Sequence, residues 1–429
     1  MGGVRARVAV RDEVALPPHV LLLLGAIAAA VVAQGGYYLP GRVLSGALAG
    51  LALVLALRTT PLRGPLVSAC GALALWALVR GGMAGDIGSA LPTVAAVGCF
   101  LAGAVVVRQE LCGDVLVWIG VGVAVTGWVA VVWRIPSWSV VADGLARASS
   151  TLTYPNAAAA LLAAVAVYAV VTGKHASVVC LLLVGLGATL SRAGVLALVV
   201  GLLVACVAAG PRVVVKNVAA PLVGALVALA ALAPSFQVAR PAQVLLAVAG
   251  LVVGVFGAHL LERAGGKVRV AVLAVGLLAA GVLGATRLES LLTGRLSLTS
   301  PDRAGALGAA WDLVAAHPVI GVGPGRGLFV WTRADGDARV MRYVHNEYVQ
   351  VLVELGVIGL GLVACVLVAV VLTVRRRATG PWAGAVAAVA VLVVHSGFDF
   401  LWHLPVVLLT AGLFVGLAAP PHPPEKEIV

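Results

Sequence analysis

The sequence predicts an all-α polytopic membrane protein with about 12–14 transmembrane helices and one large extracytoplasmic loop that contains amphipathic helices. Hydrophobic residues make up 62% of the 429-residue chain and charged residues only 11%. A soluble domain is roughly 45–50% apolar and about 25% charged. The apolar residues recur in runs near the roughly 17–25 residues that cross a bilayer. Only one long polar stretch, from Arg287 to Val344, interrupts them.

The candidate spans follow one another from the N-terminus as apolar segments, several of them short, so their number is a range rather than a single value. They cover residues 18–34, 43–57, 65–79, 90–107, 114–132, 156–172, 176–190, 193–209, 218–234, 242–261, 268–285, 349–374, 381–397 and 402–419. The expected organisation is therefore an N-terminal transmembrane bundle over residues 1–285 with about eleven spans. The large loop over 286–348, the C-terminal spans over 349–419 and a cytoplasmic tail over 420–429 complete the chain.

Loop charges predict the orientation. With the N-terminus in the cytoplasm, sixteen of the 29 Lys and Arg residues fall on the inner side, and the large outer loop holds seven of the others. This bias follows the positive-inside rule. It predicts a multi-pass protein of the cytoplasmic (inner) membrane with both termini in the cytoplasm and the large loop outside. The net charge of +12 is then mostly a topology signal, and no nucleic-acid partner is expected.

The cysteine pattern predicts neither a disulfide nor a structural zinc site. None of the six cysteines lies in the large loop, and no CxxC pair exists. Most lie within apolar runs, where a free Cys behaves as a small hydrophobic residue.

A series of short motifs follows the first five spans. They are, in order, Thr153-Tyr154-Pro155-Asn156-Ala157-Ala158, Ser191-Arg192-Ala193-Gly194, the segment from Arg303 to Trp311, the segment from His317 to Gly325, His345-Asn346-Glu347-Tyr348, and the segment from Glu354 to Gly359. In order and placement, over roughly residues 150–415, they resemble the O-antigen ligase and Wzy-type polymerase superfamily. That resemblance implies a membrane glycosyltransferase of the GT-C type, which moves a glycan from a polyprenyl-pyrophosphate carrier to an acceptor outside the membrane.

The resemblance also implies two essential arginines and a histidine, which match Arg192, Arg303 and His345. An Arg at the membrane surface needs an anionic partner or a wet cavity, and its planar fork binds phosphate in a bidentate manner. The alternative for Arg192 is a cation that extends from a helix end to the interface. The alternative for Arg303 is a solvated residue on a surface helix.

Local sequence around Arg303 predicts an amphipathic helix. Ser300 is a suitable N-cap and Pro301 a suitable first helical residue, while Leu307, Trp311 and Val314 fall on one face. Such a helix can lie across the outer mouth and present Arg303 from its first turn, beside backbone N–H groups that favour phosphate.

His345 is the expected general base, because a histidine can accept a proton from an acceptor hydroxyl. Asn346 follows it directly, and Glu347, Gln350 and Glu354 share a helix face by their spacing. An ionisable residue in a span, such as Glu354, has either a functional or a structural role. We expect supporting roles for Asn346, Glu347 and Glu354, as for Asn156 and Asp399.

Three patterns that resemble metal or nucleotide sites are better explained otherwise. Asp335-Gly336-Asp337 has the form of a DxD motif but fits a turn. The glycine-rich run from Gly321 to Gly327 lacks the GK[ST] ending of a P-loop. His395, Asp399 and His403 are spaced four apart, yet the bulky residues between them favour a helix break. No metal and no cofactor are expected.

The predicted partners are a polyprenyl-pyrophosphate-linked glycan donor (undecaprenyl pyrophosphate in bacteria), an acceptor that is a glycan, a lipid or a protein, and the lipid membrane. The alternative function is a transporter or flippase for lipid-linked glycans, which also needs charges within a membrane bundle. Transporters bind near the bilayer midplane, whereas the charges here concentrate at one face.

Overall fold

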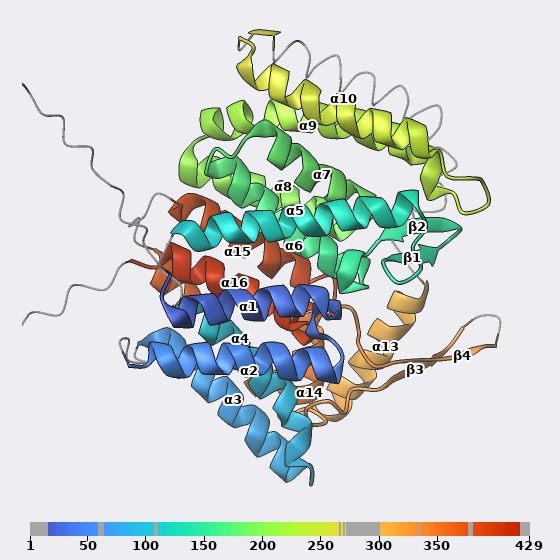
Figure 1. Ribbon diagram of the computed structural model, residues 1–429. Helices are drawn as coiled ribbons and strands as arrows, with labels where there is room; N and C mark the ends of the chain where they lie inside the picture. Colours follow the sequence, from blue (N-terminus) through green and yellow to red (C-terminus); the bar gives the residue numbers. More distant parts are fainter. Residues whose placement is uncertain are drawn as a thin grey trace, which may run out of the picture.

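The computed structural model describes residues 16–58, 64–106, 110–265, 267–268, 271, 301–333, 336–375 and 381–420. These residues form a bundle of long, roughly parallel helices (Figure 1). The helices are α1 (Pro18–Val32), α2 (Leu39–Ala56), α3 (Pro65–Met83), α4 (Leu91–Val106), α5 (Glu110–Val132), α6 (Pro155–Val171), α7 (Ala176–Ala188), α8 (Arg192–Ala209), α9 (Pro211–Phe236), α10 (Val244–Arg263), α13 (Pro301–Ala316), α14 (Glu347–Val374), α15 (Trp382–Ser396) and α16 (Pro405–Ala418). Short 3₁₀ turns connect some of them: η1 (Gln34–Gly36), η2 (Ile87–Ala90), η3 (Ser150–Leu152) and η4 (Leu401–His403).

The predicted class of all-α polytopic membrane protein is confirmed. Within the described residues, eight helical segments are long and apolar enough to cross a membrane, and five shorter apolar helices accompany them. Together they coincide with every predicted span except 268–285, most of which lies outside the described residues. The same holds for residues 286–300 at the start of the loop and for the tail beyond residue 420.

Two short β-hairpins are additions that apolar periodicity does not reveal. β1 (Ser139–Ala142) pairs with β2 (Leu145–Ala148), and β3 (Phe329–Thr332) pairs with β4 (Ala338–Met341), both antiparallel. Each hairpin occurs in a polar connection, and both project from the same end of the bundle as α13 (Figure 1). The start of α1 and the end of α16 lie at the opposite end.

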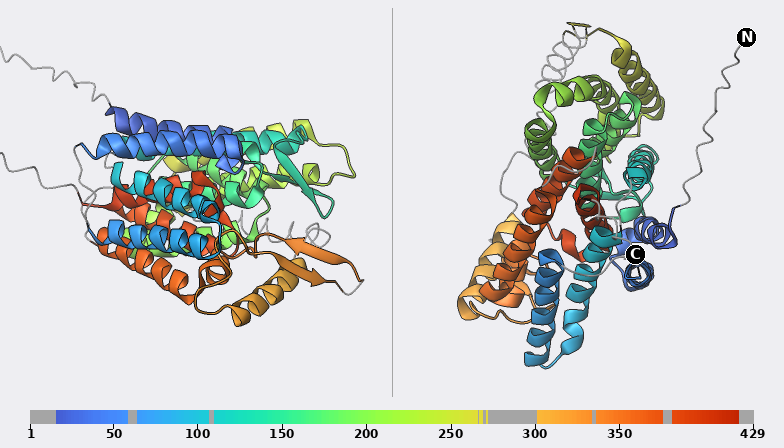
Figure 2. Two further views of the ribbon diagram at one scale, coloured as in Figure 1. Left: turned by 90° about the horizontal axis from the view of Figure 1, so that it is seen from below. Right: turned by 90° about the vertical axis from the view of Figure 1, so that its left-hand side faces the viewer.

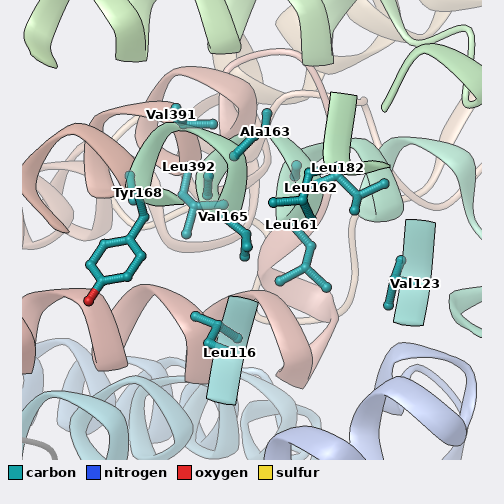
Figure 3. Close-up of a cluster of buried hydrophobic side chains, with 14 of the residues drawn as sticks. Leu116, Val123, Leu161, Leu162, Ala163, Val165, Tyr168, Leu182, Val391 and Leu392 are labelled. Carbon is teal, nitrogen blue, oxygen red and sulfur yellow. The ribbon is translucent and has the colours of Figure 1, made fainter. Parts of the chain in front are cut away.

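Helices α15 and α16 form the centre of the molecule. Seen along the helix axes, they run between a group formed by α6 to α10 and a group formed by α1 to α4 (Figure 2). α15 packs against α6 and α8, α16 packs against α4, and α14 packs mainly against α3. Helix α6 is almost entirely buried, so its sequence is apolar all round and not on one face only. Leu161, Leu162 and Val165 of α6 pack with neighbouring side chains in this core (Figure 3).

Helix α14 is interrupted at Gly356, and a segment of the preceding loop packs against the interruption. Gly356 has a φ of 70°, a left-handed conformation that only glycine adopts readily. The segment that follows α13 inserts there: Val322 N donates to Val353 O at 2.9 Å, and Gly323 N donates to Glu354 O at 2.9 Å. The buried Arg80 of α3 donates to Ile320 O at 2.6 Å and Gly321 O at 2.8 Å. The glycine-rich run is therefore a docking turn, in agreement with its interpretation from sequence.

Candidate functional site

The polar residues singled out in the sequence come from separate parts of the chain, and several meet at the carboxylate of Asp399. This residue follows α15 and is fully buried. Tyr154 Oη donates to Asp399 Oδ1 at 2.6 Å, and Asn156 Nδ2 donates to Asp399 Oδ2. The backbone N–H of Phe400 donates to Oδ1 at 2.9 Å. Two predicted supporting residues, Asn156 and Asp399, are thus in direct contact across more than two hundred residues of sequence.

His345 completes this cluster. Its Nδ1 lies 2.9 Å from Asp399 Oδ1, and its side chain is 19% exposed. An ionised carboxylate accepts a hydrogen bond, so the contact assigns the proton to Nδ1 and leaves Nε2 as the basic nitrogen. Local sequence explains the position of the ring: Asn346 caps α14 by accepting from Tyr348 N and Val349 N at 3.0 and 3.1 Å. The cap fixes the start of the helix immediately after His345.

The backbone around the cluster is strained. His345, Thr153, Ser150 and Leu190 all have positive φ, at 56°, 58°, 56° and 51°. Non-glycine residues rarely adopt this conformation, and it costs energy that surrounding structure must offset. Such residues concentrate at functional sites, so the strain supports the interpretation of this end as the working end of the molecule.

The charge state of the cluster follows from its contacts. Burial by itself raises the pKa of Asp399, but the hydrogen bond and charge of His345, the Tyr154 hydroxyl and the Arg303 guanidinium lower it more, to about 2. Burial and the adjacent Asp399 raise the pKa of Tyr154 well above its usual range. Asp399 is therefore an anion and Tyr154 a neutral donor at physiological pH.

Arg303 lies beside the same carboxylate. The predicted helix is present from Pro301 onward, and Ser300 lies outside the described residues. Arg303 Nη2 is 3.8 Å from Asp399 Oδ2, too long for a hydrogen bond, and the side chain is 44% exposed. The guanidinium is held near the cluster by charge and presents its donors to the outside, as an anion-binding group must.

Helix α13 is anchored at its first turn. Arg333 Nε donates to Asp302 Oδ1 at 2.7 Å, and its Nη2 donates to the other carboxylate oxygen. These contacts lower the pKa of Asp302. The helix packs through Ala306 and Ala310, which are fully buried, while Leu307 and Trp311 on the predicted apolar face are 38% and 51% exposed. An exposed Trp of this kind suits a helix that lies in the membrane interface.

Arg192 lies at the same end, on the far side of Asn156. It is the first residue of α8, behind Ser191, whose hydroxyl accepts from Gly194 N at 3.2 Å. Gly194 packs closely on Ala159 of α6, one turn after Asn156. The Arg192 side chain is exposed. The packing of Gly194 on Ala159 places the start of α8 beside the first turns of α6, which carries Asn156.

Arg147 is a cation that sequence reasoning missed. Its Nη2 donates to Asn156 Oδ1 at 3.0 Å, and its Nε donates to Thr189 O at 2.9 Å. It therefore links the start of α6 to the end of α7. A signal was present: Arg147 is a basic residue in a predicted outer loop, where the positive-inside rule disfavours cations.

A second polar cluster forms on the other side of His345. Glu347, Gln350 and Glu354 are buried and face inward together, as their spacing predicted. Gln350 Nε2 donates to Glu354 Oε1 at 2.7 Å, and Gly325 N donates to Glu354 Oε2 at 2.9 Å. These contacts favour the structural interpretation of Glu354, because they attach the docking turn to α14.

Glu347 has a different partner in the same cluster. Its Oε1 accepts from the backbone N–H of Trp402 and lies 3.3 Å from His403 Nδ1. Burial by itself lowers the pKa of His403. The contributions of the Glu347 carboxylate outweigh this effect, so the pKa of His403 lies above its usual value. The Glu347 carboxylate thus favours the charged form of His403, whose side chain is 22% exposed.

Stacked rings separate the two clusters. Phe400 stacks on Tyr154 and Tyr343 with ring centroids 5.0 and 4.6 Å apart. Tyr343 in turn contacts His403 at 4.3 Å, and His345 meets the edge of Phe400 at 5.1 Å. We call Tyr154, Phe400, Tyr343 and His403 the aromatic wall. One end of the wall, Tyr154, bonds to Asp399, and the other end, His403, contacts Glu347.

The patterns that resembled metal sites do not converge. In the His395, Asp399 and His403 pattern, His403 contacts Glu347 and not Asp399. Within the described part of the chain, His395 is fully buried in α15 and its ring nitrogens have no hydrogen-bond partner. Among the residues that the structure describes, no group of three or more His, Cys, Asp or Glu could hold a metal ion. Asp335 lies outside them, while Gly336 has a φ of 88° and Asp337 pairs with Arg339 at 3.3 Å. The turn interpretation fits Gly336.

The fold and site define a class: a multi-pass membrane protein with a polar, cation-rich cluster at one end of its bundle. The family model described as O-antigen ligase matches residues 239–364, less than a third of the chain. The matched part contains Arg303 and His345, and the match confirms the resemblance that the motifs indicated. A comparison with curated proteins gives no match.

Proposed function

We propose that this protein is a membrane glycosyltransferase that transfers a glycan from a polyprenyl-pyrophosphate donor to an acceptor hydroxyl at the outer face of the cytoplasmic membrane. The observation that carries the proposal is that His345 and Arg303 both lie beside the same buried carboxylate, that of Asp399. It places a histidine with a free Nε2 beside a guanidinium that faces outward. A base and an anion-binding cation side by side are what a transfer from a phosphate leaving group requires.

In the proposed step, His345 Nε2 takes the proton of the acceptor hydroxyl as its oxygen bonds to the anomeric carbon. The bond between that carbon and the pyrophosphate oxygen breaks, and its electron pair leaves with the lipid pyrophosphate. Arg303 and Arg192 hold the charge that develops on the leaving group. Asp399 keeps the Nδ1 proton in place and stabilises the imidazolium. Atoms and charge balance without a nucleotide or a redox partner.

The decisive experiment measures transfer by the purified protein in detergent with undecaprenyl-pyrophosphate-linked oligosaccharide as the donor. His345→Ala removes the base, so turnover should fall by about 10²–10⁴-fold while the donor still binds. His345→Gln keeps a hydrogen-bonding side chain but accepts no proton, and it should fail equally.

Normal turnover in His345→Ala would exclude the base assignment, and normal turnover in His345→Gln alone would leave an orienting role. The same assay separates the transporter alternative, because transport needs a sealed membrane and transfer does not. Absence of product from the wild-type protein in detergent, together with movement of donor across proteoliposomes, would favour the transporter.

A further inference from the structure

Arg147 reaches the candidate site from the first β-hairpin. It lies on β2 opposite Val140 and is half-buried. Successive side chains of a strand point to opposite faces, so Arg147 extends away from its buried neighbours Ala146 and Ala148. The backbone of the hairpin therefore determines where this guanidinium can bond.

The hairpin is itself fixed to the helical bundle. Val238, which follows α9, donates its N–H to Gly144 O in the turn of the hairpin at 3.0 Å. Arg134, between α5 and β1, donates from Nη1 to Val238 O and from Nη2 to Gln237 O, both at 2.7 Å. The hairpin cannot shift without breaking these bonds, so the attachment point of Arg147 is well defined.

One edge of the Arg147 guanidinium bonds to two acceptors from different parts of the bundle. Nε donates to Thr189 O at 2.9 Å, and Nη2 donates to Asn156 Oδ1 at 3.0 Å. Thr189 and Asn156 are both buried. Because Nε and Nη2 belong to one rigid plane, the bond to Thr189 fixes the direction in which Nη2 points. Arg147 therefore holds the side-chain oxygen of Asn156 in one place.

The amide of Asn156 connects Arg147 to Asp399. Its Nδ2 donates to Asp399 Oδ2. The two ends of an amide have nearly the same shape, so the neighbouring groups decide which end faces which side. A guanidinium only donates and an ionised carboxylate only accepts, so both partners require the same orientation. With its oxygen held by Arg147, Asn156 presents its N–H groups to Asp399.

The Asp399 carboxylate extends this series of contacts to His345. Its Oδ2 accepts from Asn156, while its Oδ1 lies 2.9 Å from His345 Nδ1. A carboxylate group is planar and rigid, so a rotation that follows the loss of a bond at one oxygen also moves the other. The position of the Arg147 guanidinium is thereby linked to the His345 ring through three successive polar contacts.

We propose that Arg147 is a positioning residue for the transfer reaction: through Asn156 and Asp399 it keeps the proton of His345 on Nδ1 and leaves Nε2 free to act as the base. The inference rests on the proposed function. Without Arg147, the buried Oδ1 of Asn156 loses this donor, which is unfavourable for a buried acceptor. The amide then turns toward other donors, Asp399 loses a hydrogen bond, and its hold on His345 weakens.

Arg134 provides a matched control for Arg147. Its guanidinium also bonds to backbone carbonyl groups beside the same hairpin, those of Gln237, Val238 and Arg240, and not to Asn156. Arg147→Met and Arg134→Met each remove one guanidinium and keep an unbranched side chain. A general loosening of the hairpin should therefore affect both variants, whereas loss of the link to Asn156 should affect Arg147→Met alone.

The first test reads the proton position on His345 by solid-state NMR of the full chain with ¹⁵N-labelled histidine in phosphatidylcholine bilayers. The measurement is made at about pH 8, where an ordinary imidazole is neutral, and the His345 signals are assigned by their loss in His345→Gln. Wild type and Arg134→Met should carry the proton on Nδ1. In Arg147→Met the ratio of Nδ1–H to Nε2–H should fall about fivefold or more, the effect of one net hydrogen bond.

Two further variants test the route and the fork. Asn156→Ala should lower the ratio as Arg147→Met does, and the double variant should show no further fall, because residues that act in series are not additive. Arg147→Lys keeps the charge and much of the bulk, so it also serves if Arg147→Met folds poorly. It should resemble Arg147→Met, since an ammonium group lacks the fixed pair of donors.

The second test is kinetic and uses the detergent assay with undecaprenyl-pyrophosphate-linked oligosaccharide. Turnover number should fall about fivefold or more in Arg147→Met, in parallel with the NMR ratio. KM for the donor should be unchanged, because Arg147 acts on the base and not on the pyrophosphate. Arg134→Met should keep the wild-type turnover number.

An unchanged NMR ratio in Arg147→Met, or an equal fall in Arg134→Met, would overturn the inference. A wild-type ratio in Arg147→Lys would also overturn it, because charge alone would then suffice. A raised donor KM in Arg147→Met would assign the residue to donor binding instead. Failure of the proposed function would be distinct: the ratio would change as expected in a protein whose wild type transfers no glycan.

Discussion

At the scale of single residues, Asp399 organises the candidate site. A buried anion is costly unless it is paired and hydrogen-bonded. Here four donors surround it, from Tyr154, Asn156, His345 and the Phe400 backbone. The sequence offered this residue as an expected supporting group and as one member of a four-residue spacing with His395 and His403. Its real partners are remote in sequence, and no local pattern identifies them.

Replacement of Asp399 by Asn tests its role as a positioning residue. The amide can donate to His345 Nδ1, which would place the ring proton on Nε2 and block its use as a base. Turnover number should fall by about 10²-fold or more, the range expected for loss of a positioned base, while KM for the donor changes little. A fall in expression together with a rise in KM would indicate a purely structural role.

Arg303 should act through its planar fork. Arg303→Ala should lower transfer by about 10²-fold or more, as does removal of a donor to developing charge in other enzymes. Arg303→Lys should recover little, because an ammonium group cannot make two parallel hydrogen bonds. Arg339→Ala is the control in the same loop, since Arg339 pairs with the exposed Asp337. Equal activity of the Arg303→Ala and Arg339→Ala proteins would remove Arg303 from the site.

At the scale of elements, the apolar runs predicted most helices to within a few residues, because hydropathy and bilayer thickness constrain spans strongly. The presence of helix α13 from Pro301 onward also followed from local rules. The two hairpins and the break in α14 did not. Gly356 adopts its conformation because the Pro318–Gly323 segment bonds to the opened helix, a contact set by tertiary packing. Tertiary packing also sets the contacts of Arg147 and the partners of Asp399, so the sequence alone does not reveal them.

The break in α14 gives a stability prediction. An alanine at Gly356 would adopt a positive φ, and its Cβ would come within 2.1 Å of Val319 O. We expect Gly356→Ala to lower the thermal midpoint in detergent by several degrees, since such strain costs on the order of 1–3 kcal/mol. Gly361→Ala, in the same helix with no atom within 4 Å of the added Cβ, should leave the midpoint unchanged or raise it. Equal midpoints would mean that the break is not required.

At the scale of the whole molecule, alternation of the described spans brings both hairpins, α13 and the candidate site to one end (Figure 1). Charge bias in the sequence predicts that this end faces outward. The sequence can predict the orientation because orientation depends on the numbers of Lys and Arg residues summed over the loops. Distances within the site depend on individual contacts, and the sequence alone could not supply them.

Cysteine labelling checks the orientation. In a variant without its six native cysteines, Val340→Cys in the exposed edge of β4 should react with an impermeant maleimide on intact cells. Arg212→Cys, at the exposed start of α9, should react only after permeabilisation. The reverse pattern would invert the topology, and equal labelling of intact cells at both positions would contradict the alternation of spans.

The contacts of Asp399 also determine when the candidate site can assemble during synthesis of the chain. Its bonds to Tyr154 and Asn156 join residues 245 and 243 positions apart. A chain leaves the ribosome N-terminus first, so α6 is inserted and packed long before its acidic partner is translated. Until then the amide of Asn156 and the hydroxyl of Tyr154 face an unfinished bundle. The candidate site therefore assembles only when the last hairpin of helices enters the membrane, and a nascent or truncated chain that ends before Asp399 lacks its central carboxylate.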